Sequence, residues 1–232
     1  MAARLVALRF EAVDPAVLAR FWAHALRRPG EERDGAFVLR PGEAGFPIEV
    51  ACGAAPKTGQ NRNHLDLTSE SDADQRETVA DLLALGARHV DVGQSADETH
   101  VVLADPEGNE LCVLAPGNRF LAGCGRLGAL NCDGTRATGV FWSEVLGWPL
   151  VWDRDGETAI QAPDRTGPKI TWSGPPLIPK AGRNRLHLSI ALDGDRASEL
   201  DRLLGLGATP LDADGVLFAD PDGNELRVEP GE

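Results

Sequence analysis

Residues 56–65 read PKTGQNRNHL, and residues 179–188 read PKAGRNRLHL. Seven residue types recur in the same order at a constant offset of 123 positions (187 − 64). Such a repeat indicates an internal duplication, so the fold is expected to be an assembly of repeated units. Each copy ends with a histidine, His64 or His187, that opens an alternating segment. Alternation places His64 and Asp66 on one face of the strand and Leu65 and Leu67 on the other. Since His64, and likewise His187, faces away from the apolar side, both histidines are site candidates.

The rest of the chain follows the same duplication. In the first half the pattern predicts strands near 4–10, 36–40, 47–52, 64–67, 89–92, 100–103 and 110–114, with helices from Asp14-Pro15 and over 71–85. In the second half, Phe141-Trp142 repeats Phe21-Trp22, and ADPDGNEL at 219–226 repeats ADPEGNEL at 104–111. We therefore predict four β-α-β-β-β units in two domains, residues 1–116 and 124–232, joined by a segment that contains proline and glycine.

Composition limits the partners. The net charge of −13 argues against nucleic acid and against an anionic membrane surface, and it is compatible with a cationic ligand. None of the four cysteines lies in a C-x-x-C pair, so their spacing indicates neither a disulfide framework nor a zinc motif. No signal peptide or membrane-spanning run is present, and we expect a cytoplasmic protein. Pairing of the two domains is expected, and a homodimer stays open.

The Phe-Trp helix, the R-x-H-L-x-L strand, L-x-x-L-G-A and A-D-P-x-G-N-E-L together resemble the vicinal oxygen chelate superfamily. Within it, the chain is similar to glyoxalase and bleomycin-resistance proteins over nearly its whole length. The resemblance implies an α+β fold of tandem glyoxalase-like domains. Each domain would contain two βαβββ units that form a curved mixed sheet, or cup, around a pocket.

The resemblance also implies a divalent metal ion in some members, held by histidine and glutamate. The family's histidine matches His64 and His187, and its first glutamate matches Glu49 in domain one but Thr171 in domain two. The other ligand positions fall on Leu5, Leu127, Cys112 and Arg227, with Glu110 and Glu225 available only after a register shift. A metal site for catalysis needs about three protein ligands, so we predict no complete family-type metal centre. The alternative is one divalent ion held by Glu49 and His64.

Four residues are the predicted ligand-binding set: Glu49, His64, His187 and Trp172. The alternative for the histidines is a structural role in the loop that precedes them. The Asn-Arg pairs at 61–62 and 184–185 are expected to pin that loop or to contact the paired domain.

Three classes of function stay open at this point. The first is a metal-free protein that binds a small molecule, as drug-resistance relatives do. The second is a small-molecule lyase, isomerase or dioxygenase-like enzyme, with Glu49 and His64 as candidate catalytic residues. The third is a protein–protein module.

Overall fold

The computed structural model describes residues 2–42, 44–54, 57–95 and 97–229, which form four consecutive βαβββ units. The first half comprises β1 (Arg4–Ala12), α1 (Pro15–Ala25), β2 (Gly30–Arg33), β3 (Ala36–Leu39), β4 (Ile48–Cys52), β5 (Asn63–Leu67), α2 (Asp72–Ala84), β6 (Arg88–His89), β7 (Val101–Ala104) and β8 (Glu110–Val113). The second half comprises β9 (Leu127–Cys132), α3 (Arg136–Leu146), β10 (Leu150–Arg154), β11 (Glu157–Ile160), β12 (Lys169–Trp172), β13 (Leu186–Ala191), α4 (Arg196–Gly205), β14 (Thr209–Pro210), β15 (Leu217–Ala219) and β16 (Glu225–Val228). The sequence pattern does not predict β2, because all four of its residues are exposed and no apolar alternation marks it.

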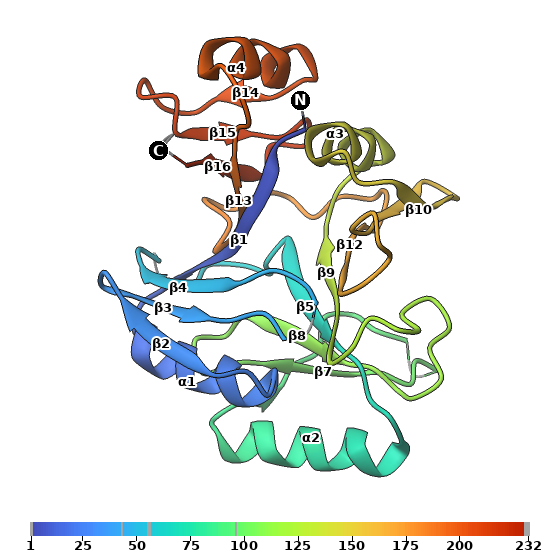
Figure 1. The fold of residues 1–232 in the computed structure, drawn as a ribbon. Coiled ribbons are helices and arrows are strands. Elements are labelled where there is room, and N and C mark those ends of the chain that lie inside the picture. Colours follow the sequence, from blue (N-terminus) through green and yellow to red (C-terminus); the bar gives the residue numbers. More distant parts are fainter. Residues whose placement is uncertain (1, 43, 55–56, 96, 230–232) are drawn as a thin grey trace.

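The strands form two eight-stranded mixed sheets (Figure 1). Sheet A has the order β14-β15-β16-β13-β1-β4-β3-β2. Sheet B has the order β10-β11-β12-β9-β5-β8-β7-β6. The predicted α+β class, with curved sheets of two βαβββ units each, is confirmed.

Each sheet joins units from different halves of the chain. In sheet A, β1 runs antiparallel to β13, with Leu8 opposite Leu188. In sheet B, β5 runs antiparallel to β9, with Leu65 opposite Leu130. Because of the repeat, the first strands of equivalent units have similar sequence patterns. The sequence alone therefore does not decide whether a unit pairs with the other unit of its own half or with a unit of the other half. The predicted boundary at 116–124 lies in the connection from β8 to β9 and stays a prediction.

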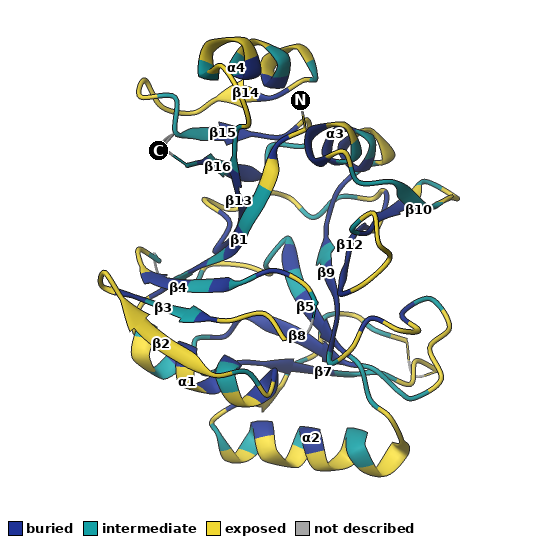
Figure 2. Cartoon of the chain, in the orientation of Figure 1, coloured by how far each residue is buried: buried dark blue, intermediate teal, exposed yellow. Residues whose placement is uncertain are grey.

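The outer faces of the sheets form the core together with the helices (Figure 2). Asp14 caps α1 by accepting from the Val17 backbone N–H at 3.1 Å, as the sequence predicts. The helix then turns Trp22 onto the sheet, where its ring lies 5.8 Å from that of Phe10. Complete burial of a side chain such as Phe10 stabilises the fold by about 1.5–3 kcal/mol. Because successive side chains of a strand point to opposite faces of the sheet, the faces opposite to this core are free to carry polar side chains.

Among the described residues, none of the helices has the length and apolar character needed to cross a membrane.

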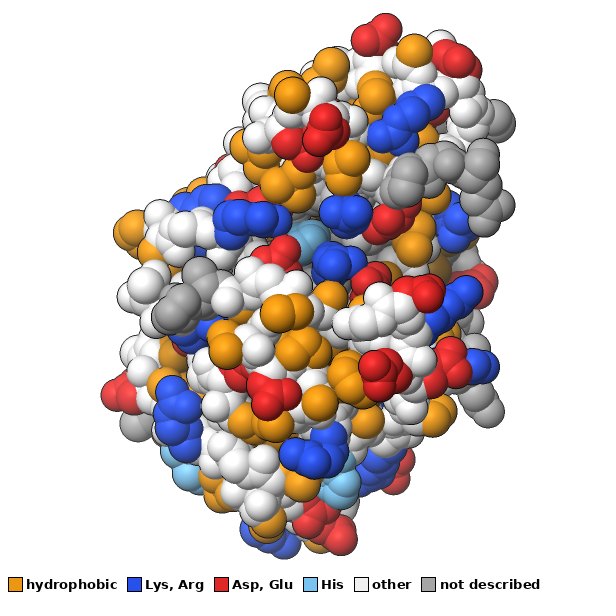
Figure 3. Space-filling model, turned by 90° about the vertical axis from the view of Figure 1, so that its left-hand side faces the viewer, with side chains coloured by type: hydrophobic (Ala, Val, Ile, Leu, Met, Phe, Trp, Pro, Cys, Tyr) orange, Lys and Arg blue, Asp and Glu red, His pale blue; other side chains and the backbone are white. Residues whose placement is uncertain are grey.

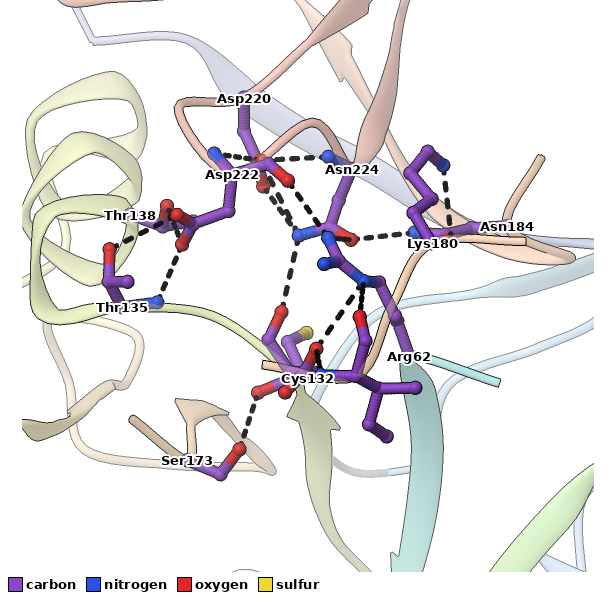
Figure 4. Close-up of polar contacts among 12 residues, drawn as sticks. Arg62, Cys132, Thr135, Thr138, Ser173, Lys180, Asn184, Asp220, Asp222 and Asn224 are labelled. Carbon is purple, nitrogen blue, oxygen red and sulfur yellow. Dashed lines mark hydrogen bonds and ion pairs between the residues drawn. The ribbon is translucent and has the colours of Figure 1, made fainter. Parts of the chain in front are cut away.

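The repeated Asp-Pro-x-Gly-Asn turns attach consecutive units to each other. Asp220 Oδ2 accepts from Trp142 Nε1 at 3.3 Å, and Asp105 Oδ2 accepts from Trp22 Nε1 at 3.1 Å. Asp222 supplies the cap that α3 lacks in its own sequence, accepting from the Thr135 N–H at 2.5 Å (Figure 4). Each turn therefore fixes the start of the helix in the preceding unit.

The repeated loops attach one half of the chain to the other. Arg62 Nη1 donates to the backbone oxygen of Asp222 at 2.8 Å (Figure 4). In the pseudo-symmetric contact, Arg185 Nη1 donates to Glu107 at 3.2 Å. These arginines are expected to pin the loop or to contact the paired domain, and both make contacts with the other half of the chain. Asn184 pins its own loop, because its backbone N–H donates to Glu225 at 3.1 Å.

Candidate functional site

The inner face of sheet A brings together residues from both halves of the chain. Arg9 on β1 lies opposite Glu49 on β4 and opposite His187 on β13. Arg9 Nη1 donates to Glu49 Oε1 at 2.7 Å. Two of the predicted site residues, Glu49 and His187, therefore flank Arg9 from the two strands beside β1, although they are 138 residues apart (187 − 49). Arg9 is not among the residues predicted from the sequence, although it lies in the predicted strand near 4–10.

The structure does not bring Glu49 and His64 together. His64 lies on β5 in sheet B, opposite Asn131 on β9, while Glu49 lies in sheet A. The expectation that domain one unites them fails because each sheet takes its units from different halves. Neither a shared acid–base pair nor a shared metal site can be built from Glu49 and His64 in this arrangement.

Trp172 lies in the core and not on an inner face. Its side chain is 1% exposed, and its ring fills the space beside Gly134 and Gly139 at the start of α3. The neighbouring Thr171 has the opposite orientation, since it pairs with Asn131 on the inner face of sheet B. Trp172 lines a cavity together with His187, but this cavity of about 10 Å³ holds at most about one water molecule. The role of Trp172 in ligand binding stays a prediction.

Three arginines surround His187 on the inner face of sheet A. Besides the Arg9–Glu49 pair, Arg183 contacts Glu11 at 3.2 Å, and Arg227 Nε lies 3.3 Å from Glu229 Oε1. The six residues Arg9, Glu11, Glu49, Arg183, His187 and Arg227 are called the His187 cluster below.

Electrostatics keep the His187 imidazole neutral. Burial and the positive charges of Arg9, Arg183 and Arg227 lower the pKa of His187 to about 3. Its Nδ1 atom is buried and has no hydrogen-bond partner among the described residues. Burial also raises the pKa of Glu11, against the attraction of Arg183 and Arg9. The cluster therefore combines fixed positive groups with a neutral imidazole that can still accept or donate a hydrogen bond.

The divalent metal ion implied by the fold family does not fit the His187 cluster. Glu49 and His187 occupy two of the four ligand positions, but Glu49 is already paired with Arg9. The other two positions hold Leu5, which has no donor atom, and Arg227, whose guanidinium repels a cation. Two ligands beside a fixed positive charge are too few for a divalent ion.

The inner face of sheet B has a different composition. His64 and Asp66 on β5 and Cys112 on β8 have potential ligand atoms that all lie within 4.8 Å of one another. His64 Nε2 lies 3.3 Å from Asp66 Oδ1, and Cys112 lies directly opposite Asp66 in the strand register. Burial lowers the pKa of His64, but Asp66 and Cys112 raise it by more, so it lies well above its usual range. Burial raises the pKa of the Cys112 thiol. The sequence showed that His64 and Asp66 share a face, but not that Cys112 joins them.

The side of the molecule at the left in Figure 1 is hollowed at its waist, where positive and acidic side chains gather around a histidine (Figure 3). A cavity of about 290 Å³ lies between the two repeated loops, and Glu11 and Arg183 of the His187 cluster are among its lining residues. Ligand pockets usually have about 300–1,000 Å³, so this cavity suits a small molecule only.

A sequence profile described as "glyoxalase-like domain" matches residues 6–114 and again residues 129–229. The chain belongs to the glyoxalase-like domain family. The expected family is thereby confirmed, with one match in each half of the chain. No curated protein sequence matches this glyoxalase-like chain significantly.

Solved structures show the same fold. Glyoxalase I from Zea mays superposes with a TM-score of 0.63 at 13% identity, covering 98% of this chain and 92% of that one. A putative dioxygenase from Bacillus subtilis subsp. subtilis str. 168 has a TM-score of 0.58 at 14% identity, covering 98% of this chain and 86% of that one. At such low identity these likenesses establish the glyoxalase-like fold and not the reaction.

Proposed function

We propose that this glyoxalase-like protein binds a small organic molecule on the inner face of sheet A without a metal ion, as a binding protein of the drug-resistance type. The observation that carries the proposal is the His187 cluster, in which Arg227 stands at a position where metal-dependent relatives would have a carboxylate. A guanidinium attracts an anionic oxygen at the place where a metal ion would otherwise attract it.

The donor groups of the cluster suit a ligand that carries a carboxylate or another acidic oxygen. A guanidinium has five N–H donors in a planar fork, and Arg9 uses Nη1 for its hydrogen bond to one oxygen of Glu49. About a quarter of the Arg9 side chain and a third of the Arg227 side chain are exposed, so a ligand can reach both. The net charge of the chain leaves a cationic ligand open, but the three arginines around His187 favour an anionic group at this place.

Two buried polar atoms at the base of this face support the proposal. His187 Nδ1 and Ser189 Oγ have no hydrogen-bond partner among the described residues. An unsatisfied buried polar group costs about 1–3 kcal/mol. A ligand, or water held with it, that supplies these partners would recover part of that free energy. This gain adds to the attraction of Arg9 and Arg227.

The experiment is a thermal-shift screen with a library of small carboxylates, phenolates and amines, in buffer that contains a chelator. We expect some anionic compounds to raise the melting temperature, by the same amount with and without the chelator. Arg227→Gln should weaken binding of these compounds by about 10- to 100-fold, because a charge-assisted hydrogen bond contributes about 1.5–3 kcal/mol. Arg154→Gln, on an exposed residue of sheet B, is the matched control for loss of one positive charge.

Two results would contradict the proposal. One is a set of ligands that bind only when a divalent ion is added. The other is a set of anionic ligands whose affinity is the same for the wild type and for Arg227→Gln, measured on variants whose circular dichroism shows that they are folded.

A further inference from the structure

The inner face of sheet B holds a compact set of three groups that can bind a metal ion. The ligand atoms of His64, Asp66 and Cys112 lie within 4.8 Å of one another. With bond lengths of about 2.0–2.3 Å, neighbouring ligands of a tetrahedral ion lie roughly 3.3–3.6 Å apart. The distance of 3.3 Å between His64 Nε2 and Asp66 Oδ1 already lies in this range. Small side-chain rotations would bring Cys112 Sγ to the same spacing.

Asp66 carries an atom that the protein itself does not satisfy. The residue is 8% exposed, and its Oδ1 atom has no hydrogen-bond partner among the described residues. His64 Nε2 lies 3.3 Å from Oδ1 and forms an ion pair with it when the ring is protonated. With His64 neutral, as metal binding requires, this buried carboxylate oxygen would lack a partner at a cost in free energy, and a bound cation would remove that cost.

The chemistry of the three donors selects the kind of ion. Imidazole nitrogen, carboxylate oxygen and thiolate sulfur together suit Zn²⁺ and similar transition-metal ions. Mg²⁺ and Ca²⁺ prefer oxygen ligands throughout, so a cysteine at the site disfavours them. The His64 side chain is about one quarter exposed, which leaves one side of the cluster open to a further ligand.

Sheet A provides an internal contrast. The positions equivalent to the three residues carry His187, Ser189 and Arg227, at offsets of 123, 123 and 115 residues (187 − 64, 189 − 66, 227 − 112). The duplication has therefore kept the histidine in both sheets. Only sheet B surrounds it with a carboxylate and a thiol.

We infer that His64, Asp66 and Cys112 form a binding site for a thiophilic divalent ion such as Zn²⁺ on the inner face of sheet B. This site uses Asp66, at a position that the family resemblance does not assign to a ligand, and a cysteine where the family has a glutamate. The site is independent of the function proposed for sheet A, because it shares no residue with the His187 cluster.

The test uses the full chain, stripped of metal with a chelator and then loaded with Zn²⁺ or Co²⁺. Metal content is measured by mass spectrometry after gel filtration, and Co²⁺ coordination by its absorption spectrum. We expect one equivalent of Zn²⁺ and, with Co²⁺, a thiolate-to-metal charge-transfer band in the ultraviolet. Cys112→Ser should abolish that band. Both Cys112→Ser and Asp66→Asn should weaken Zn²⁺ binding by more than about 100-fold, which exceeds the usual effect of a group that only orients a ligand.

Cys52→Ser is the matched control, since Cys52 is an exposed thiol outside the cluster, and it should change neither the metal content nor the spectrum. The inference is overturned if folded wild-type protein binds no stoichiometric Zn²⁺, or if Co²⁺ gives no charge-transfer band. It is equally overturned if the band survives in folded Cys112→Ser. The cobalt spectrum of the wild type decides the matter even if a variant does not fold.

Discussion

Asp220 offers a quantitative test of how the repeated turn holds the units together. Its carboxylate is buried and accepts hydrogen bonds from Trp142 Nε1 and from the backbone N–H groups of Asp222 and Asn224. Burial raises the pKa of Asp220 from 3.8 to about 6, and these hydrogen bonds offset only part of that rise. The folded protein therefore binds the Asp220 proton more tightly than the unfolded chain does.

The direction of the pH effect follows from this difference. The stability that protonated Asp220 contributes is fully present below pH 3.8 and is lost as the pH rises through about 6. A rise from 3.8 to about 6 corresponds to roughly 3 kcal/mol, at 1.36 kcal/mol for each pKa unit. About 2 kcal/mol of this falls between pH 4 and pH 8. Other groups also titrate in this range, so the effect has to be isolated by a substitution.

The measurement compares wild type with Asp220→Asn by urea unfolding at several pH values from 4 to 8. Asparagine keeps an oxygen that can accept from the two backbone N–H groups, and it does not titrate. The wild type should lose about 2 kcal/mol of stability relative to the variant as the pH rises. Asp105→Asn should change stability in the same direction, because burial raises the pKa of Asp105 as well. A difference between wild type and Asp220→Asn that is constant, or that grows in favour of the wild type with pH, would refute the reasoning.

Two further predictions concern the second half of the chain, and both are checked by denaturant or thermal unfolding. Asp222→Ala removes the cap that accepts from the Thr135 N–H and should cost about 1–2 kcal/mol, while Asp222→Asn should cost less; equal costs would contradict the capping role. Gly139→Ala should cost about 1–3 kcal/mol or more, because the added Cβ would lie 1.9 Å from Thr158 Oγ1. Gly205→Ala, at the last residue of α4 with open space around the new Cβ, is the control and should change stability by less than about 0.5 kcal/mol. A destabilised control together with a neutral Gly139→Ala would refute the packing argument.

Local features of this fold could be predicted from the sequence because they depend on neighbouring residues. Asp14 caps α1 at the predicted position, and α2 lies within the predicted range 71–85 with Ser71 as its cap. The duplication likewise predicts four similar units, and the structure contains them. The cap of α3 could not be predicted, because Asp222 supplies it from a turn 87 residues away.

The composition of the two inner faces could not be predicted for the same reason. Cys112 joins His64 only through the pairing of β5 with β8, and Glu49 shares an inner face with His187 only because β1 pairs with β4 and with β13. These pairings are between strands distant in sequence, and the repeat leaves that of β1 with β13 ambiguous. The sequence therefore predicts that Glu49 lies with His64, whereas the strand pairing places it on the same sheet as His187.

The central claim, that the His187 cluster binds a small anionic molecule without a metal ion, is tested most directly by nuclear magnetic resonance of the histidine rings. The chain contains only five histidines, so ¹⁵N-histidine labelling gives a simple spectrum, and His187→Gln assigns the signal of interest. A carboxylate from the screen, titrated in the presence of a chelator, should shift the His187 ring nitrogens and leave those of His64 in place. A shift confined to His64, or no shift of any histidine while the compound binds, would contradict the claim.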